Sequence, residues 1–169
     1  FGLLDQINLK EINTNSKIKL KNFNLEFIST THSIPQPSAI VISTVYGNLL
    51  HTADWKIDNT PTLGDDFNKK AFENLGNQGI LALIGDSTNA DIPGYSQSEN
   101  EVKEELISVF SRYNKRIIIT CFSSNIARMQ NIVRAAKKNN RKIALVGRSM
   151  KRTIEAAMKS NFIKDQDIF

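Results

Sequence analysis

The sequence predicts an α/β protein in two parts, the first built mainly of strands and the second of alternating strands and helices. Apolar and polar residues alternate at period two in the first third, as in half-buried strands. The last third follows the order strand, helix, strand, helix, which predicts a parallel sheet with right-handed crossovers. We place the boundary near Ser96 and expect parts spanning residues 1–96 and 97–169.

Five strands and one helix are expected in the first part. Period-two alternation predicts four short strands, at residues 18–20, 24–28, 39–44 and 48–52. A helix over residues 67–75 has its apolar residues on one face and ends at Gly76. The wholly apolar run 79–84 predicts a strand buried on both faces of a sheet, and it leads directly into a polar loop.

The second part is expected to begin with a helix whose N-terminus is a capping box. Ser98 and Glu101 have the spacing of such a box. Two apolar runs further on, residues 117–122 and 142–146, predict strands, each followed by an amphipathic helix. Parallel sheets of this kind bind ligands at the carboxyl ends of their strands, so the loops that follow these strands are candidate sites.

Positive charge is concentrated in one segment. Residues 112–152 hold 12 of the 22 Lys and Arg residues and none of the 17 Asp and Glu residues, although the whole chain has a net charge of only +5. Such a segment attracts a polyanion, which favours a nucleic acid as partner. A set of solvated helix faces is the simpler alternative.

The cellular setting is indicated by what the sequence lacks. Cys121 is the single cysteine, so no disulfide can form within the chain, and its place in an apolar run is typical of inert packing. No apolar run approaches the roughly 20 residues that span a bilayer. We therefore expect a cytoplasmic protein without a membrane partner. Because the chain starts at Phe1 and ends at Phe169 without a polar tail, we interpret it as a piece of a longer protein.

Two loops contain candidate metal ligands. His32 follows the strand 24–28, and Asp54 follows the strand 48–52, so the hairpin between them can bring both loops to the same edge of the sheet. A neutral imidazole and a carboxylate suit zinc, but a zinc site needs three or four ligands. Taken alone, His32 is better explained as a loop histidine with a local hydrogen bond.

Five short motifs follow one another along the chain, at residues 31–35, 51–58, 85–90, 121–128 and 147–150. Together they resemble the bacterial ribonuclease J family, in which a metallo-β-lactamase fold contains an inserted β-CASP domain. The resemblance covers roughly residues 18–158. It implies that residues 1–96 are part of a metallo-β-lactamase αββα sandwich and that residues 97–169 are part of a Rossmann-like, parallel-sheet β-CASP domain.

The resemblance also implies roles for individual residues. His32 would be a zinc ligand and catalytic residue, and Asp54 the catalytic carboxylate that bridges two zinc ions in the complete enzyme. His51 would lie near the metals. Residues at strand ends, at helix N-termini and in the basic segment would contact RNA or its phosphates. They are Asp86, Ser87, Ser123, Ser124, Asn125, Lys137, Lys138, Arg141 and Arg148.

The implied function is a zinc-dependent ribonuclease that hydrolyses RNA phosphodiesters in RNA processing and decay. Exonuclease or endonuclease action stays open, as does a homo-oligomer of the complete enzyme. The family's His-x-His-x-Asp-His run is expected before residue 1 and its late histidines after residue 169, so we expect this piece to be inactive and to lack bound zinc. The chain also has Ala53 where the family usually has glycine, Gln36 in place of an acid, and Ala127 where many members have histidine.

Other functions remain alternatives at this stage. One is a metallo-hydrolase of the same fold that acts on another substrate, since a fold does not determine a substrate. Another is a non-catalytic module that binds nucleic acid through the basic segment. A mononucleotide-binding α/β domain is a third alternative, but Gly147 is isolated and forms no glycine-rich phosphate loop.

Overall fold

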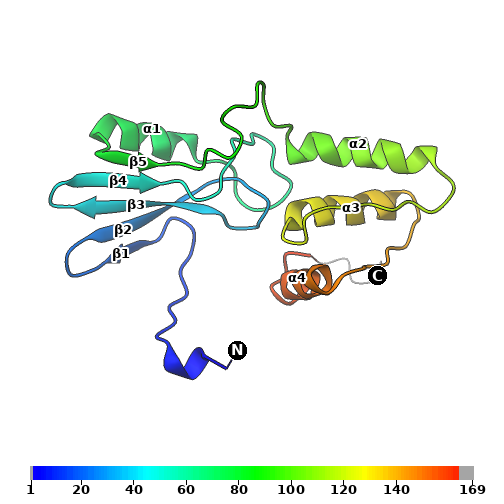
Figure 1. Ribbon diagram of the computed structural model, residues 1–169, viewed down its shortest axis with the longest axis horizontal. Coiled ribbons are helices and arrows are strands. Elements are labelled where there is room, and N and C mark those ends of the chain that lie inside the picture. Colours follow the sequence, from blue (N-terminus) through cyan, green and yellow to red (C-terminus); the bar gives the residue numbers. More distant parts are fainter. Residues whose placement is uncertain (1, 164–169) are drawn as a thin grey trace.

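A computed structural model describes residues 2–163 of the chain. Its first part contains a short 3-10 helix, η1 (Leu4–Gln6), and a five-stranded sheet in the order β1-β2-β3-β4-β5 (Figure 1). The strands are β1 (Lys17–Lys19), β2 (Asn24–Ser29), β3 (Ser38–Thr44), β4 (Gly47–His51) and β5 (Ala82–Ile84). The first four form an antiparallel meander, and β5 pairs in parallel with β4. All five predicted strands are confirmed in existence and order.

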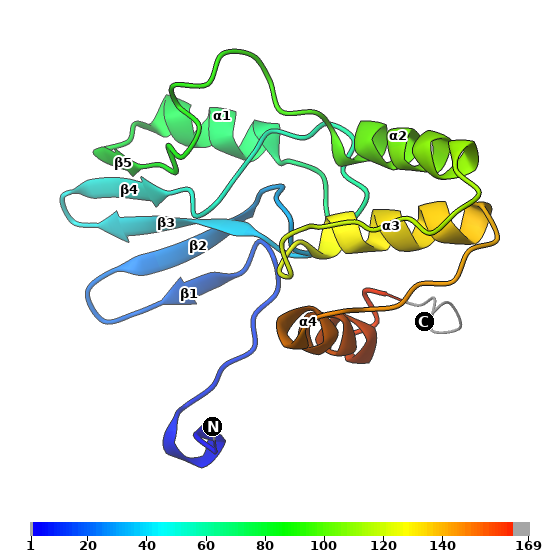
Figure 2. The same ribbon diagram turned by 45° about the vertical axis from the view of Figure 1, so that its right-hand side comes forward.

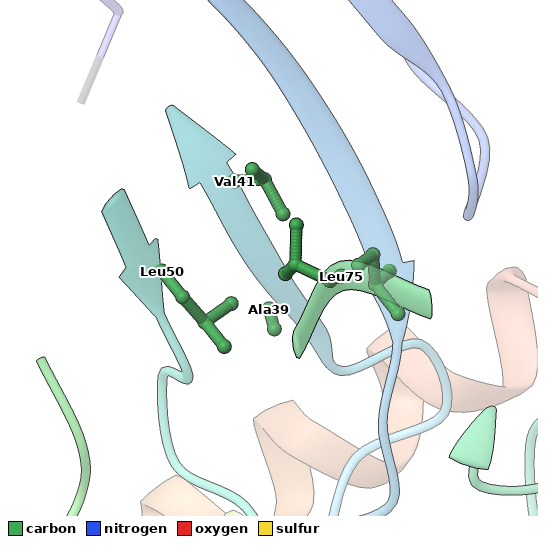
Figure 3. Packing of buried hydrophobic residues seen from close by; sticks show 5 residues of the cluster. Ala39, Val41, Leu50 and Leu75 are labelled. Carbon is green, nitrogen blue, oxygen red and sulfur yellow. The ribbon is translucent and has the colours of Figure 1, made fainter. Parts of the chain in front are cut away.

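The sheet packs one face against helix α1 (Lys69–Gln78). Ile28 pairs with Ala39 across β2 and β3, and Val41 pairs with Leu50 across β3 and β4, so all four side chains share that face. Leu75 of α1 packs on them and closes this core (Figure 3). The helix begins two residues later than predicted, because Asn68 caps it by accepting a hydrogen bond from Ala71 N at 3.1 Å.

The prediction for the apolar run 79–84 is wrong in one respect. Only residues 82–84 form strand β5, and this strand lies at the edge of the sheet with its side chains exposed, Leu83 at 64%. Its apolar composition is typical of burial on both faces, but the only strand beside it is β4 and no second layer of residues 2–163 covers it. The apolar composition of residues 79–84 therefore predicted a buried strand, but no part of residues 2–163 covers this strand.

Three helices dominate the second part: α2 (Glu99–Arg112), α3 (Ile126–Lys138) and α4 (Arg148–Lys159). Helices α2 and α3 lie side by side, and α4 lies on the other side of α3 (Figure 2). Phe110 of α2 packs with Val133 and Ala136 of α3, whereas Met129 of α3 packs with Ile154 of α4. The capping box predicted at Ser98 and Glu101 is confirmed.

The predicted parallel sheet of the second part does not form among the described residues. Residues 117–122 and 142–146 are extended, but neither segment is paired in a strand ladder. Their inward side chains, including Ile117 and Ile143, pack on α2 and α3, while Ile118 and Val146 point away and are exposed. Parallel ladders are stable when both faces of the sheet are covered. Here only the helix-facing side is covered.

None of the helices in residues 2–163 has the length and apolar composition needed to cross a membrane.

Candidate metal and RNA site at the loops after β2, β4 and β5

The loops that contain His32 and Asp54 lie side by side. Thr31 and Lys56 form an isolated antiparallel bridge, with a hydrogen bond of 2.9 Å from Lys56 N to Thr31 O. The Thr31 hydroxyl donates to Lys56 O at 2.6 Å and accepts from Asp58 N at 3.1 Å. His32 comes directly after Thr31, and Asp54 lies two residues before Lys56. The bridge therefore brings the backbone segments of His32 and Asp54 next to each other.

The loop after β5 joins the same region. Thr52 Oγ1 accepts a hydrogen bond from Asp86 N at 3.1 Å, and Trp55 Nε1 donates to Asp86 O at 3.4 Å. The Asp86 carboxylate accepts two hydrogen bonds from Thr88, which hold the pKa of Asp86 below its usual value, and the nearby His32 imidazole lowers this pKa further. The loops after β2, β4 and β5 thus converge at one end of the sheet.

The side chains around Asp54 are ordered by local hydrogen bonds. His51 Nδ1 accepts from Ala53 N at 3.0 Å, and Thr52 Oγ1 donates to Ala53 O at 2.8 Å. Ala53 has a φ of +54°, in the left-handed region where glycine is favoured. His32 Nδ1 lies 3.1 Å from the Ser33 hydroxyl, which is the local hydrogen bond expected of a loop histidine.

The donors of residues 2–163 do not complete a zinc site. Within residues 2–163, no three His, Cys, Asp or Glu side chains are grouped so that they could hold a metal ion. Catalytic zinc sites use three protein ligands and an open position. His32 and Asp54 are ligand types that zinc accepts, but on their own they do not fit the two zinc ions that the resemblance implies.

The N-terminus of α3 lies next to the His32 loop. Ala127 N, in the first turn of α3, donates to Ser33 O at 3.1 Å. Asn125 is the helix cap, because its side chain accepts from Arg128 N at 2.8 Å. Ser123 and Ser124 immediately precede this cap. These three predicted phosphate-binding residues are therefore close in space to the His32 loop.

The other predicted RNA contacts are spread over the second part. Lys137 and Lys138 lie in the last turn of α3, roughly 18 Å from its N-terminus for a helix of this length. Arg141 donates hydrogen bonds to Lys115 O at 3.0 Å and Phe110 O at 3.5 Å, so its guanidinium links backbone segments. Arg148 starts α4. Lys137, Lys138 and Arg141 are therefore not among the residues of the convergent loops, which do contain Asp86 and Ser87.

A buried charged cluster beside the site was missed by the sequence analysis. Glu99, the first residue of α2, forms ion pairs with Arg128 of α3 and with Lys56 of the Asp54 loop. Asp58 pairs with the same lysine. The sequence analysis included Asp58 only within the motif 51–58 and did not single out Glu99, because the sequence contains no signal that identifies their partners.

Comparison with known proteins places these residues in a family. The sequence profile of the family described as "Ribonuclease J, beta-CASP domain" matches residues 114–169. Ribonuclease J 1 of Streptococcus pyogenes is 41% identical over 96% of this chain, and ribonuclease J of Synechocystis is 40% identical over 98% of it. Ribonuclease J of Thermus thermophilus is 40% identical over 99% of the chain.

The match covers only part of these relatives. The chain spans 29% of the Streptococcus protein, 26% of the Synechocystis protein and 30% of the Thermus protein. A crystal structure of a protein of unknown function from Enterococcus faecalis shares the fold over 88% of this chain and 35% of its own, with a TM-score of 0.61 at 17% identity. The chain, a mixed α/β protein, belongs to the ribonuclease J family and corresponds to a region that includes β-CASP sequence.

Proposed function

We propose that this chain is the part of a ribonuclease that supplies one histidine and one aspartate to a metal centre and a basic helical surface to RNA. In this proposal, residues 1–96 are part of a metallo-β-lactamase sandwich and residues 97–169 are part of a β-CASP domain. The full-length protein, meaning the longest natural product that contains these residues, would hydrolyse RNA phosphodiesters with zinc in the reducing cytoplasm. The names of the similar proteins support the substrate.

The observation that supports this proposal most is the bridge between Thr31 and Lys56. It brings the loops of His32 and Asp54 together, as a shared metal centre requires, and the Asp86 loop joins them. The missing ligands would come from outside residues 1–169, which is consistent with the share of its relatives that the chain spans. His32 and Asp54 would bind metal, and the metal would supply a nucleophilic hydroxide and charge stabilisation.

Replacement of Asp54 tests this role. Asp54→Asn in the full-length protein should lower kcat for RNA cleavage by more than about 100-fold, since loss of groups that only support ligands already costs 10–100-fold. The Asp54 side chain is exposed and makes no hydrogen bond or ion pair with the other residues of 2–163, so the circular dichroism spectrum should be unchanged. Asp91→Asn, at an exposed aspartate of the loop that follows β5, is the matched control. Near-normal turnover of Asp54→Asn would contradict the proposal.

The incomplete donor set favours a second candidate, a nucleic-acid-binding module without catalysis. Both candidates predict that affinity for RNA falls with salt, because the basic residues 112–152 would contact phosphates. They differ in chemistry, so cleavage of RNA by the full-length protein that a chelator removes and zinc restores would exclude the module. A preference for RNA over DNA of equal length would exclude a hydrolase of the same fold with another substrate.

A further inference from the structure

Five side chains, three of them buried and two partly exposed, form a polar cluster between the Asp54 loop and the helix pair. Lys56 and Asp58 belong to the loop after β4, Glu99 starts α2, and Arg128 and Asn131 lie on α3. The side chains of Asp58 and Glu99 are only 1% and 6% exposed, and Asn131 is fully buried. A carboxylate that is taken out of water is costly unless its partners are well placed.

Each carboxylate oxygen of the cluster has a partner. Glu99 Oε1 accepts from Arg128 Nη2 at 3.0 Å, and Oε2 accepts from Arg128 Nε at 3.3 Å and from Asn131 Nδ2 at 3.2 Å. Asp58 accepts from Thr60 N at 2.9 Å and from Glu99 N at 2.9 Å. Lys56 Nζ lies 3.3 Å from the Asp58 carboxylate and 3.6 Å from the Glu99 carboxylate. Such bonds are directional, so they define a position as well as an attraction.

The cluster connects both candidate ligand loops to the same helices. Through Lys56 and Asp58 it holds the loop that contains Asp54. Arg128 is one residue beyond Ala127, whose N–H bonds to Ser33 O in the loop that contains His32. Outside the sheet, the bridge between Thr31 and Lys56 and the bonds of the Thr31 hydroxyl join these loops directly. The helix pair therefore supplies a second, independent tie between them.

We propose that Glu99 is a positioning residue, whose carboxylate holds the Asp54 loop on α2 and α3 and so keeps Asp54 in register with the His32 loop. This inference rests on the proposed function and deepens it. Net stabilisation is not the best explanation of the cluster, because apolar residues of similar volume often stabilise a fold as well as a buried ion pair does. The directional hydrogen bonds of Glu99 instead fix the geometry between the proposed RNA-binding helices and the proposed reacting groups, His32 and Asp54.

Glu99→Gln tests the proposal, since it keeps the shape of the side chain and removes its charge. In the full-length protein we expect kcat for RNA cleavage to fall by about 10- to 100-fold, because small misplacements of reacting groups have effects of that size. KM for RNA should stay within about twofold, since Arg128 is the only basic residue among residues 112–152 of the described structure that contacts the Glu99 side chain.

Trp55 provides a readout that does not depend on activity. It is the single tryptophan of residues 1–169, so any other tryptophan of the full-length protein is replaced by phenylalanine for this measurement. Trp55 precedes Lys56, and its ring lies 6.1 Å from the ring of Phe67 and 6.4 Å from that of Phe72. If Glu99 holds the loop, the emission maximum of Trp55 in Glu99→Gln should shift to longer wavelength as the loop loosens and water reaches the indole. The shift should be seen well below the melting temperature, where the far-ultraviolet circular dichroism is unchanged.

Two further variants keep the test decisive if Glu99→Gln folds poorly. Arg128→Lys retains the charge but loses the two-pronged guanidinium contact, so it should give a smaller Trp55 shift and a smaller loss of kcat. Glu104→Gln is the matched control on the same helix, because Glu104 pairs with Lys103 at the surface with its side chain 57% exposed. It should change neither readout.

Equal Trp55 spectra for Glu99→Gln, Arg128→Lys and Glu104→Gln would overturn the proposal, as would a Trp55 shift in Glu99→Gln that leaves kcat unchanged in an active full-length enzyme. If the unmodified full-length protein with zinc does not cleave RNA, the proposed function fails instead. The Trp55 spectra would then still decide whether Glu99 holds the loop.

Discussion

Ala53 has a backbone conformation that alanine rarely adopts. Its φ of +54° lies in the left-handed region, which costs an L-residue with a Cβ atom roughly 1–2 kcal/mol. The residue stands between β4 and Asp54, so the strain is located in the candidate site. Replacement by glycine removes this cost, and the greater freedom of glycine in the unfolded chain offsets about 0.4–1 kcal/mol of the gain.

We predict that Ala53→Gly raises the free energy of unfolding by about 0.5 kcal/mol, measured by urea denaturation with Trp55 fluorescence. Ala156→Gly is the control, because Ala156 is exposed in α4 with ordinary helical geometry and the change should cost up to about 1 kcal/mol. Equal destabilisation by both changes would show that Ala53 is not strained.

Asp58 has a carboxyl pKa below its ordinary value. Burial alone raises this pKa, but the hydrogen bonds from Glu99 N, Thr60 N and Ser98, together with the charge of Lys56, outweigh burial and lower it. A group whose pKa is lower in the folded state than in the unfolded state stabilises the fold above its unfolded pKa. That contribution is lost as the pH falls through the folded pKa.

We predict that the free energy of unfolding falls as the pH drops below about 4, near the pKa of an unfolded aspartate, and that Asp58→Asn weakens this dependence. Urea denaturation at several pH values would measure both slopes. Asp91→Asn should keep the unmodified slope, since Asp91 is exposed and outside the cluster. An unchanged slope in Asp58→Asn would contradict the prediction.

At the scale of elements, the N-terminus of α2 is held by Ser98. Its hydroxyl accepts from Asn100 N at 3.1 Å and donates to Thr60 O at 2.9 Å, and its N–H donates to Glu101 Oε2 at 3.0 Å. The bonds from Asn100 N and Ser98 N satisfy N–H groups at the start of the helix that have no carbonyl partner in the helix. The bond to Thr60 O ties the helix to the loop that contains Asp54.

We predict that Ser98→Ala lowers the free energy of unfolding by about 1 kcal/mol, as loss of a helix cap does. Ser111→Ala on the same helix should change it by less than about 0.5 kcal/mol, because the exposed Ser111 hydroxyl only donates to Ser108 O. Thermal unfolding followed by circular dichroism would compare the two. A loss in Ser98→Ala no larger than that in Ser111→Ala would contradict a capping role.

At the scale of the whole molecule, the extended segments 117–122 and 142–146 leave apolar side chains in water. Ile118 is 86% exposed and Phe122 is 83% exposed, and their even spacing puts them on one side of the same extended segment. Exposed apolar surface of this kind binds hydrophobic dyes and promotes association. Because these two side chains are exposed, they do not contribute to the free energy of unfolding of this chain.

We predict that the double change Ile118→Ser and Phe122→Ser lowers binding of a hydrophobic dye to this chain and changes the free energy of unfolding by less than about 0.5 kcal/mol per residue. Ile154→Ala should instead cost about 2–5 kcal/mol, because Ile154 is buried between α3 and α4. A large loss of stability in the double variant would show that these side chains are covered in solution.

The sequence by itself determined the local features of this protein. Period-two alternation identified β1 to β4, and the spacing of Ser98 and Glu101 identified the start of α2, because both signals depend only on neighbouring residues. Family motifs identified the ribonuclease J relationship. The roles of His32 and Asp54 remain predictions, although the structure brings their loops together.

Tertiary structure alone decided which distant residues meet. Glu99 finds Arg128 and Lys56 across 29 and 43 positions of sequence, and α3 begins beside Ser33, contacts that no local pattern encodes. It also decided that the apolar runs 79–84, 117–122 and 142–146 differ from the buried strands that their composition predicts. Burial and strand pairing depend on which neighbours are present to cover a segment, and composition contains no information about those neighbours.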